Sequence, residues 1–272
     1  MKAILVINDN SPEAEHAALF ALKIAKKMQL RVLLANTLPV IKGQLKAFAG
    51  RPFETTPAHG NETLEQLSLV NEKFSGFKPG ITELDISALD EHALVQLINK
   101  SEMAMMVKGM PHVLPLVKSK PDFDIVLHKV RCPLLLVPDT WEIKKIERLV
   151  YIADLRFCRT LMVNYLAAMA KSCDASLSVA HLSAKGIPDM EETWANKVFK
   201  TEVYDRLDYK QVYFNNIREK DLKKALDVII NGMHNDILAF VNHRFHFQEL
   251  IGRYLTDILP AHITVPLLIF PY

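Results

Sequence analysis

The fold is decided by the stretch ILVINDNSPEAEHAALFALKIAKKM at residues 4–28, followed by RVLLANTL at 31–38. It opens with an apolar run that is typical of a buried strand, and the run ends in a polar turn that contains Asp9. Ser11 suits the N-cap and Pro12 the first position of a helix, so we expect a helix with an apolar face to follow. A second apolar strand comes next, and this β-α-β order predicts a parallel sheet.

Strands and helices continue to alternate, and the second half of the chain repeats the order of the first. After the opening unit we expect strands at 81–87, 104–109 and 133–138 with helices near 61–75, 90–100 and 121–131; the repeat has strands at 148–155, 177–183, 211–217, 236–242 and 266–272 with helices near 158–171, 188–207, 219–233 and 247–261. The closing strands agree almost residue for residue, as PLLLVP in the first half and PLLIFP in the second. An internal repeat of this length predicts two copies of one fold.

The repeat predicts two domains within the 272 residues. We place the first at 1–138, a polar linker at 139–145 and the second at 146–272, with a Gly- and Pro-rich insertion at about 39–60 in the first domain. The predicted fold class is α/β, with two tandem doubly wound five-stranded parallel sheets. Strands that are apolar without alternation fit sheets covered by helices on both faces.

The last strand of each repeat predicts how the two domains meet. Each would be an apolar strand at an unpaired sheet edge, which needs cover. We therefore expect residues 133–138 to contact residues 266–271, with the domains packed about a pseudo-two-fold axis as an intramolecular pseudo-dimer. Because the halves are so similarly organised, we expect two doubly wound domains and not one continuous sheet with a Rossmann connection.

Composition excludes several classes of function. The chain has 33 basic and 31 acidic residues without a run of like charge, so nucleic-acid binding has no electrostatic footprint. The apolar runs are far shorter than the ~18–20 residues that cross a bilayer. The apolar stretch near the N-terminus is too short for a signal peptide, so we expect it to be the first strand. Cys132, Cys158 and Cys173 are widely spaced, which indicates neither a disulfide framework nor a zinc site. We expect a cytoplasmic protein without membrane or nucleic-acid partners.

Several of these segments resemble universal stress proteins. The resemblance rests on residues 4–28 and 31–38, on the strand that ends at Gly109, and on the closing V-x-x-P-L-L-L-V-P and V-P-L-L-I-F-P strands. It covers both repeats apart from the insertion and the linker. His181 also matches a histidine that is common on the second strand of that family, where the first domain has Asn36.

The resemblance implies a strand order of 3-2-1-4-5 and, in many members, ATP or AMP bound at the carboxyl ends of strands 1 and 4. This is also the point where the strand order reverses, at which ligands of open α/β sheets are expected to bind. Asp9 and Asp154 would then contact the adenosine part, and a G-x-x-G-x9-G-[ST] segment after strand 4 would hold the phosphates. This chain departs from that pattern. Only Gly109 of the segment is present in the first domain. In the second domain Asn242 replaces the first glycine, and Arg253 and Tyr254 stand at the position of the Gly-Ser pair, with Gly252 one residue earlier.

Each candidate also has an ordinary structural interpretation. Asp9 and Asp154 are equally suited to turns or helix caps. A set of basic residues would either hold an anion in place of the lost glycines or form a solvated helix face; these are Lys118, Lys120, Arg244 and Arg253.

Other motifs give weaker signals. His243 and His246 have the spacing of a metal-binding pair, but they lack a third ligand, so we predict no metal site. The insertion suits a lid, a docking loop or a disordered segment. No G-x-S-x-G, Walker A or G-x-G-x-x-G motif follows a strand, so the sequence does not indicate an enzyme.

Two functional hypotheses follow. The first is a non-enzymatic stress-response sensor or scaffold in which nucleotide binding is lost or weakened. The second is an ATP- or AMP-binding protein with slow ATP hydrolysis, which uses the crevice at the ends of strands 1 and 4. A homodimer or a protein partner fits either hypothesis.

Overall fold

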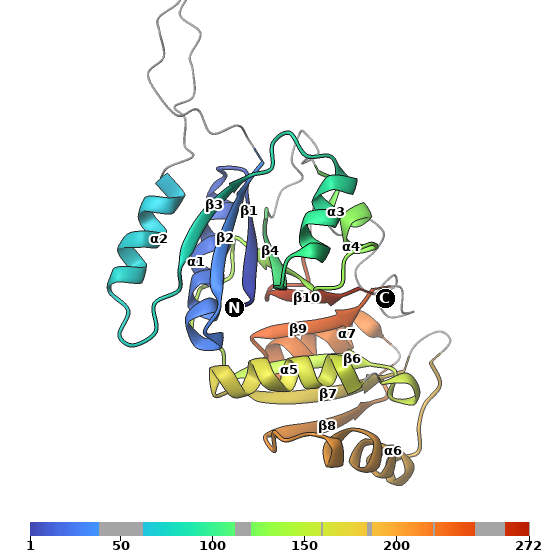
Figure 1. Cartoon of the computed structure of the whole chain (residues 1–272). Helices are drawn as coiled ribbons and strands as arrows, with labels where there is room; N and C mark the ends of the chain where they lie inside the picture. The colour runs from blue at the N-terminus through green and yellow to red at the C-terminus, as the bar shows by residue number, and fades with distance from the viewer. Residues whose placement is uncertain are drawn as a thin grey trace, which may run out of the picture.

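The structure is a computed structural model in which residues 1–37, 62–111, 121–158, 160–183, 187–219, 221–242 and 259–271 are described. Its strands are β1 (Ala3–Asn8), β2 (Arg31–Asn36), β3 (Ile81–Asp85), β4 (Met103–Met110), β5 (Leu134–Pro138), β6 (Arg148–Ala153), β7 (Ser176–Leu182), β8 (Val212–Ile217), β9 (Ile237–Val241) and β10 (Leu267–Phe270). Its helices are α1 (Pro12–Met28), α2 (Glu62–Glu72), α3 (Glu91–Lys100), α4 (Phe123–Leu127), α5 (Thr160–Cys173), α6 (Glu192–Val198) and α7 (Leu222–Asp227). Figure 1 shows the first half of the chain above the second.

All strands join one ten-stranded sheet in the order β3-β2-β1-β4-β5-β10-β9-β6-β7-β8. Each half has the predicted 3-2-1-4-5 order, and the strands within each half are parallel. The α/β fold class is therefore confirmed. The two five-stranded sheets join edge to edge, so that the ten strands form one continuous sheet and not two sheets that only pack together.

The junction is an antiparallel pairing of β5 with β10. Leu136 pairs with Leu267, Leu135 with Leu268, and Leu134 with Ile269. The predicted contact between residues 133–138 and 266–271 is thus present. The pair formed by Leu135 and Leu268 lies at its centre, and these two leucines hold the same place in PLLLVP and PLLIFP. β5 and β10 would each be an edge strand of its own half, and their pairing satisfies the backbone hydrogen bonds of both.

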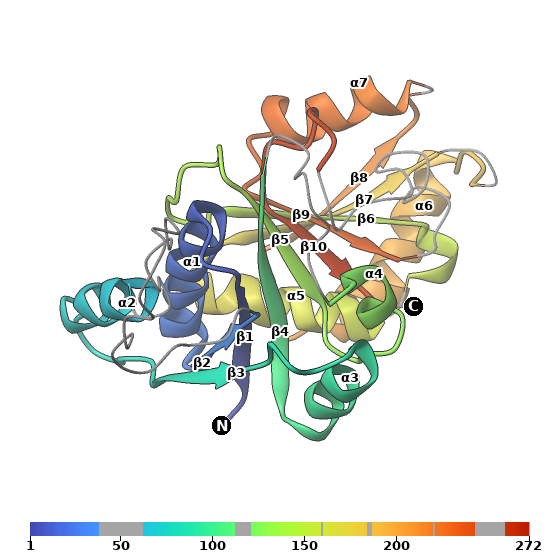
Figure 2. The same ribbon diagram turned by 90° about the horizontal axis from the view of Figure 1, so that it is seen from above.

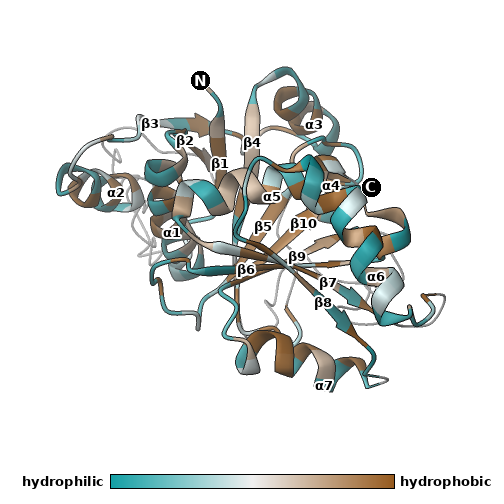
Figure 3. Cartoon of the chain, turned by 90° about the horizontal axis from the view of Figure 1, so that it is seen from below, coloured by the Kyte–Doolittle hydropathy of each residue, from teal (hydrophilic) through white to brown (hydrophobic). Residues whose placement is uncertain are grey.

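Helices cover both faces of the sheet. In the first half α1 and α2 lie on one face and α3 and α4 on the other, while α7 lies across the sheet from α5 and α6 in the second half (Figures 2 and 3). The strands in the middle of Figure 3 are hydrophobic, and the polar residues gather on the outer surfaces of the helices. This arrangement explains why β1, β5, β9 and β10 are buried at every residue.

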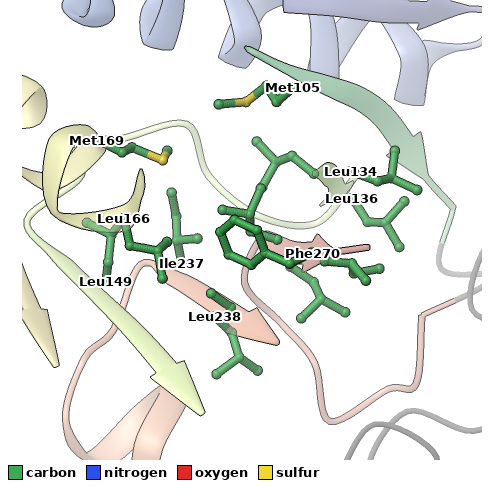
Figure 4. Packing of buried hydrophobic residues seen from close by; sticks show 14 of the residues in the cluster. Met105, Leu134, Leu136, Leu149, Leu166, Met169, Ile237, Leu238 and Phe270 are labelled. Atoms are coloured by element: carbon green, nitrogen blue, oxygen red, sulfur yellow. The ribbon is translucent and has the colours of Figure 1, made fainter. Parts of the chain in front are cut away.

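A single hydrophobic core runs through both halves. Figure 4 shows how Leu134 and Leu136 of β5 pack with Phe270 of β10, with Met105 from β4 and Ile237 from β9 nearby. The aromatic ring of Phe270 also lies edge-on to that of Tyr165 in α5, with the centroids 5.4 Å apart. The halves are therefore joined by side-chain packing as well as by the sheet.

The segment predicted as a linker is packed against the rest of the chain. Trp141 is buried, and its ring contacts that of Phe20 in α1 edge-on at 4.6 Å between centroids. Lys144 pairs with the buried carboxylate of Asp236 at 2.7 Å. That carboxylate also accepts hydrogen bonds from the backbone amides of Glu147 and Arg148, at 2.8 and 3.0 Å. Asp236 therefore anchors the entry into β6.

Most predicted elements are present, and the differences lie at helix ends. Ser11 caps α1 by accepting a hydrogen bond from the amide of Ala14, as predicted. The helix expected at 121–131 is shortened to α4, and those expected at 188–207 and 219–233 consist of α6 and α7 continued by π-helical turns. The insertion at 39–60 and most of the helix expected at 247–261 lie outside the described residues.

Candidate functional site

The two crevices predicted at the carboxyl ends of strands 1 and 4 lie apart from each other. The strands of one half run opposite to those of the other where β5 meets β10, so their carboxyl ends point to opposite edges of the common sheet. In addition β1 and β6 are separated by four strands, or about 24 Å at the usual strand spacing. Asp9 and Asp154 therefore belong to two separate sites.

Asp9 makes the turn that leads from β1 into α1. Its carboxylate accepts hydrogen bonds from the backbone amide of Ser11 at 3.1 Å and from the Ser11 hydroxyl at 2.5 Å. The next residue, Asn10, has a positive φ of 62°, which asparagine tolerates in turns. The turn interpretation of Asp9 is thus confirmed, and its carboxylate remains exposed to solvent.

Beneath Asp9 the first half has a buried amide network that the sequence analysis missed. Asn8 and Asn36, which end β1 and β2, face each other in the sheet, and the Asn8 side-chain amide donates to the Asn36 oxygen at 2.7 Å. Asn36 in turn donates to the Glu83 carboxylate at 3.3 Å, and Asn8 to Asn10 at 3.1 Å. These contacts satisfy polar groups that are almost fully buried. The network fixes the floor of the crevice.

Gly109 lies on β4 directly under the first turn of α1. A Cβ atom at this position would be 2.1 Å from the Glu13 carbonyl oxygen and 2.8 Å from the Ala14 nitrogen. Backbone atoms cannot move aside as a flexible side chain can, so only glycine permits this approach of helix to strand. Packing therefore requires Gly109 whether or not a phosphate binds.

Lys108 is a further polar residue of this crevice that was not singled out from the sequence. It lies next to Gly109 near the carboxyl end of β4 and is buried. Side chains alternate along a strand, so Lys108 points to the face opposite Gly109. Its ammonium group lies 5.7 Å from the centre of the Phe123 ring in α4. The interruption of the apolar run AMMVKG by a lysine was the available signal.

Asp154 occupies the same place in the second half but has different contacts. Its side chain is buried, and Arg156 binds both carboxylate oxygens, with Nε at 2.9 Å and NH2 at 2.7 Å. The Arg156 backbone amide also donates to this carboxylate, at 3.1 Å. Burial alone raises the pKa of Asp154, but the hydrogen bonds and the charge of Arg156 outweigh burial and lower it. Asp154 is thus an ionised cap with a charge partner of its own.

His181 is fully buried beside Asp154. Its Nδ1 accepts a hydrogen bond from the Leu155 backbone amide at 3.3 Å, and its Nε2 lies 3.2 Å from the Pro188 carbonyl oxygen. These partners place the ring proton on Nε2. In the sheet His181 pairs with Ala153 just as Asn36 pairs with Asn8, so the correspondence of His181 with Asn36 is confirmed.

Asn242 is buried just after β9, where its backbone amide donates to the Phe270 carbonyl at 2.8 Å. The sheet register corrects its assigned place. Gly109 pairs with Val137, and the matching Phe270 pairs with Val241. Val241, not Asn242, is therefore the counterpart of Gly109.

Several candidate residues lie outside the described residues. They are Lys118, Lys120, His243, Arg244, His246 and Arg253. Within the described part of the chain, no group of three or more His, Cys, Asp or Glu side chains could hold a metal ion. In the same part, none of the helices combines the length and apolarity that crossing a membrane requires.

The three cysteines are free thiols. Burial raises the pKa of Cys132 to about 12 and that of Cys173 to about 11. Burial, together with the charge of Asp154, also raises the pKa of Cys158 to about 12. A raised pKa keeps a thiol protonated and unreactive, so these residues have the properties of core side chains.

Comparison with solved structures gives the same fold. A universal stress protein from Archaeoglobus fulgidus DSM 4304 aligns over 99% of this chain and 98% of its own, with 16% identity and a TM-score of 0.59. A functionally unknown protein, PA1789 from Pseudomonas aeruginosa PAO1, aligns over 100% of this chain and 92% of its own, with 12% identity and a TM-score of 0.55. A protein from Pseudomonas aeruginosa UCBPP-PA14, provisionally described as a universal stress protein, aligns over 100% and 93% of the two chains, with 12% identity and a TM-score of 0.53.

The chain therefore has a universal stress protein-like fold over its full length. No family model and no curated protein matches the sequence. At these identities the likeness defines the fold and leaves the function to be argued from the residues of this chain.

Proposed function

We propose that this protein is a non-enzymatic stress-response sensor or scaffold in which nucleotide binding at the crevices is lost or much weakened. The two halves act as an intramolecular pseudo-dimer. The stress-response role is supported by the fold that this chain has in common with universal stress proteins.

The observation that carries the proposal for the second crevice is the pairing of Asp154 with Arg156. A ribose hydroxyl would have to share the Asp154 carboxylate with the Arg156 guanidinium, which already binds both of its oxygens and leaves fewer acceptor sites open. His181 beside it uses both ring nitrogens on backbone groups. A nucleotide would have to break these contacts first, and that cost lowers its affinity.

A second candidate function is ATP or AMP binding in the first half, with slow ATP hydrolysis. One observation favours it. Within the described part of the chain Asp9 hydrogen-bonds only to neighbouring Ser11, and its carboxylate is exposed at the carboxyl end of β1.

Calorimetric titration of the full chain with ATP and AMP, with and without Mg²⁺, separates the two functions. The proposed function predicts dissociation constants of about 1 mM or weaker. Micromolar binding that Asp9→Ala abolishes and Asp154→Ala leaves unchanged would establish the second function instead. Micromolar binding abolished by Asp154→Ala would show that the pairing with Arg156 does not close the second crevice.

A further inference from the structure

A cavity of about 380 Å³ lies between the carboxyl-terminal part of α1, the linker and the end of α5. Figure 1 shows the ends of α1 and α5 close together there. We call it the lysine pocket, because its lining includes Lys23, Lys26, Lys27, Lys144 and Lys145. Its volume lies in the range of small-molecule sites, about 300–1,000 Å³.

The inner lining of the lysine pocket is apolar. Phe20 and Ile24 on α1 are almost fully buried, and Ile146 and Cys173 are also buried. Phe74 lies at the side of the pocket, where the ammonium group of Lys26 is 4.2 Å from its ring centre. An apolar surface with cations at its edge suits a ligand that has an apolar body and a charged head.

The positive charge of the pocket is only partly compensated. None of the described residues that line it is acidic. Lys144 is paired with Asp236 at 2.7 Å, and Lys145 lies 4.0 Å from Glu147. Lys26 and Lys27 make no ion pair within the described part of the chain.

The helix dipole accounts for only part of this cluster. Lysines in the last turn of a helix are favourable, and this explains Lys26 and Lys27. Lys23 and Lys27 are four residues apart and repel each other across one helix face. Two more lysines reach the same place from the linker. Such repulsion is relieved when an anion binds.

The lysine pocket is distinct from both crevices. The turn at Asp9 precedes α1, whereas Lys26 and Lys27 are in its last turn. A helix of 17 residues places these two ends roughly 24 Å apart. The pocket also lies at the start of β6, while Asp154 follows the end of that strand.

From these observations we infer that the lysine pocket binds a small amphipathic anion. Lys26 and Lys27 hold its carboxylate or phosphate head, and its apolar body lies against Ile24 and Phe74. The site is independent of nucleotide binding at the crevices, so its test stands apart from that of the proposed function.

The inference is tested by calorimetric titration of the full chain at low ionic strength with decanoate and decyl phosphate. Decanol and inorganic phosphate serve as ligand controls, because each has only one of the two features. We expect both amphipathic anions to bind more tightly than about 1 mM, and both controls to bind at least about tenfold more weakly. Equal binding of decanol, or of inorganic phosphate, would overturn the inference, as would failure of both anions to bind. The stronger of the two anions identifies the head group.

Variants then locate the site. The double variant Lys26→Gln/Lys27→Gln should weaken binding at least about fivefold, whereas the matched exposed pair Lys100→Gln/Lys129→Gln should change it less than about twofold. Ile143→Asp adds a carboxylate at the pocket from a half-buried position and should also weaken it. Binding that persists in both pocket variants, or that falls equally in the control pair, would overturn the assignment. Asp9→Ala should leave this binding unchanged.

Discussion

The close approach of α1 to β4 gives a sharp test of how the first half is built. A methyl group at position 109 would lie 2.1 Å from the Glu13 carbonyl oxygen and 2.3 Å from its carbon. Unstrained contacts between such atoms are about 3.5 Å long, so helix and strand would have to separate by roughly 1.4 Å. Because α1 is held down by buried residues along its length, this separation would disturb the core. We expect Gly109→Ala to lower the free energy of unfolding by about 3 kcal/mol.

The assay is urea denaturation followed by circular dichroism, together with a thermal melt in which Tm should fall by roughly 6–12 °C. Gly80→Ala is the matched control, because a Cβ atom at Gly80 meets nothing within 4 Å. It should change the free energy of unfolding by less than about 0.5 kcal/mol. If Gly109→Ala were as stable as the control, the packing argument would be refuted, and the glycine would need another explanation.

Three further predictions concern buried polar groups and thiols. Burial raises the pKa of Asp154, but the contacts with Arg156 lower it by more, so the net pKa is lowered. The contribution of Asp154 to stability is therefore present above the ordinary carboxyl pKa and is lost as the pH falls through the lower folded value. In urea titrations the stability difference between wild type and Asp154→Asn should shrink from about pH 5 to about pH 2, and a constant difference would contradict this. Asp236→Ala removes the carboxylate that anchors β6 and should lower the free energy of unfolding by about 3 kcal/mol. The exposed control Asp205→Ala should lower it by less than about 0.5 kcal/mol. Equal losses in the two variants would show that the anchor is dispensable. Burial raises the pKa of Cys132 to about 12. In the native protein Cys132 should therefore react with a thiol reagent at least about 100-fold more slowly than in the protein unfolded in urea, as measured by mass spectrometry. Similar rates in the two states would show that the surroundings of Cys132 open readily.

Much of the fold could be predicted because its signals are local. The apolar run of β1, the Ser-Pro start of α1 and the repeat of PLLLVP as PLLIFP are all visible in short windows. The contact between β5 and β10 followed from the physical need to cover two apolar edges. The joining of the two sheets into one could not be predicted in the same way. The sequence does not distinguish strands that only pack against each other from strands that form hydrogen bonds to each other.

The candidate sites were harder to predict because their contacts are distant in sequence. Asn8 and Asn36 end adjacent parallel strands, so their pairing could have been foreseen from the strand ends alone. Asp236 contacts residues nearly ninety positions away, and nothing near it in the sequence indicates that role. The lysine pocket likewise depends on how α1 meets the linker.

The two crevices differ at the counterpart of Gly109, which is Val241, and in where the following helix begins. In the first half α1 begins at Pro12, three residues after Asp9, and its first turn presses on Gly109. In the second half a 3₁₀ turn at Leu155–Phe157 intervenes, and α5 begins only at Thr160, six residues after Asp154.

The helix that follows the turn aspartate thus begins three residues later in the second half, where Val241 stands at the counterpart of Gly109. The same 3₁₀ turn brings the Arg156 guanidinium back onto Asp154. The later helix start, the residue larger than glycine and the paired carboxylate therefore occur together in the second half. Since one chain carries both halves, the contacts around Asp154 can differ from those around Asp9 while β10 covers the edge of β5.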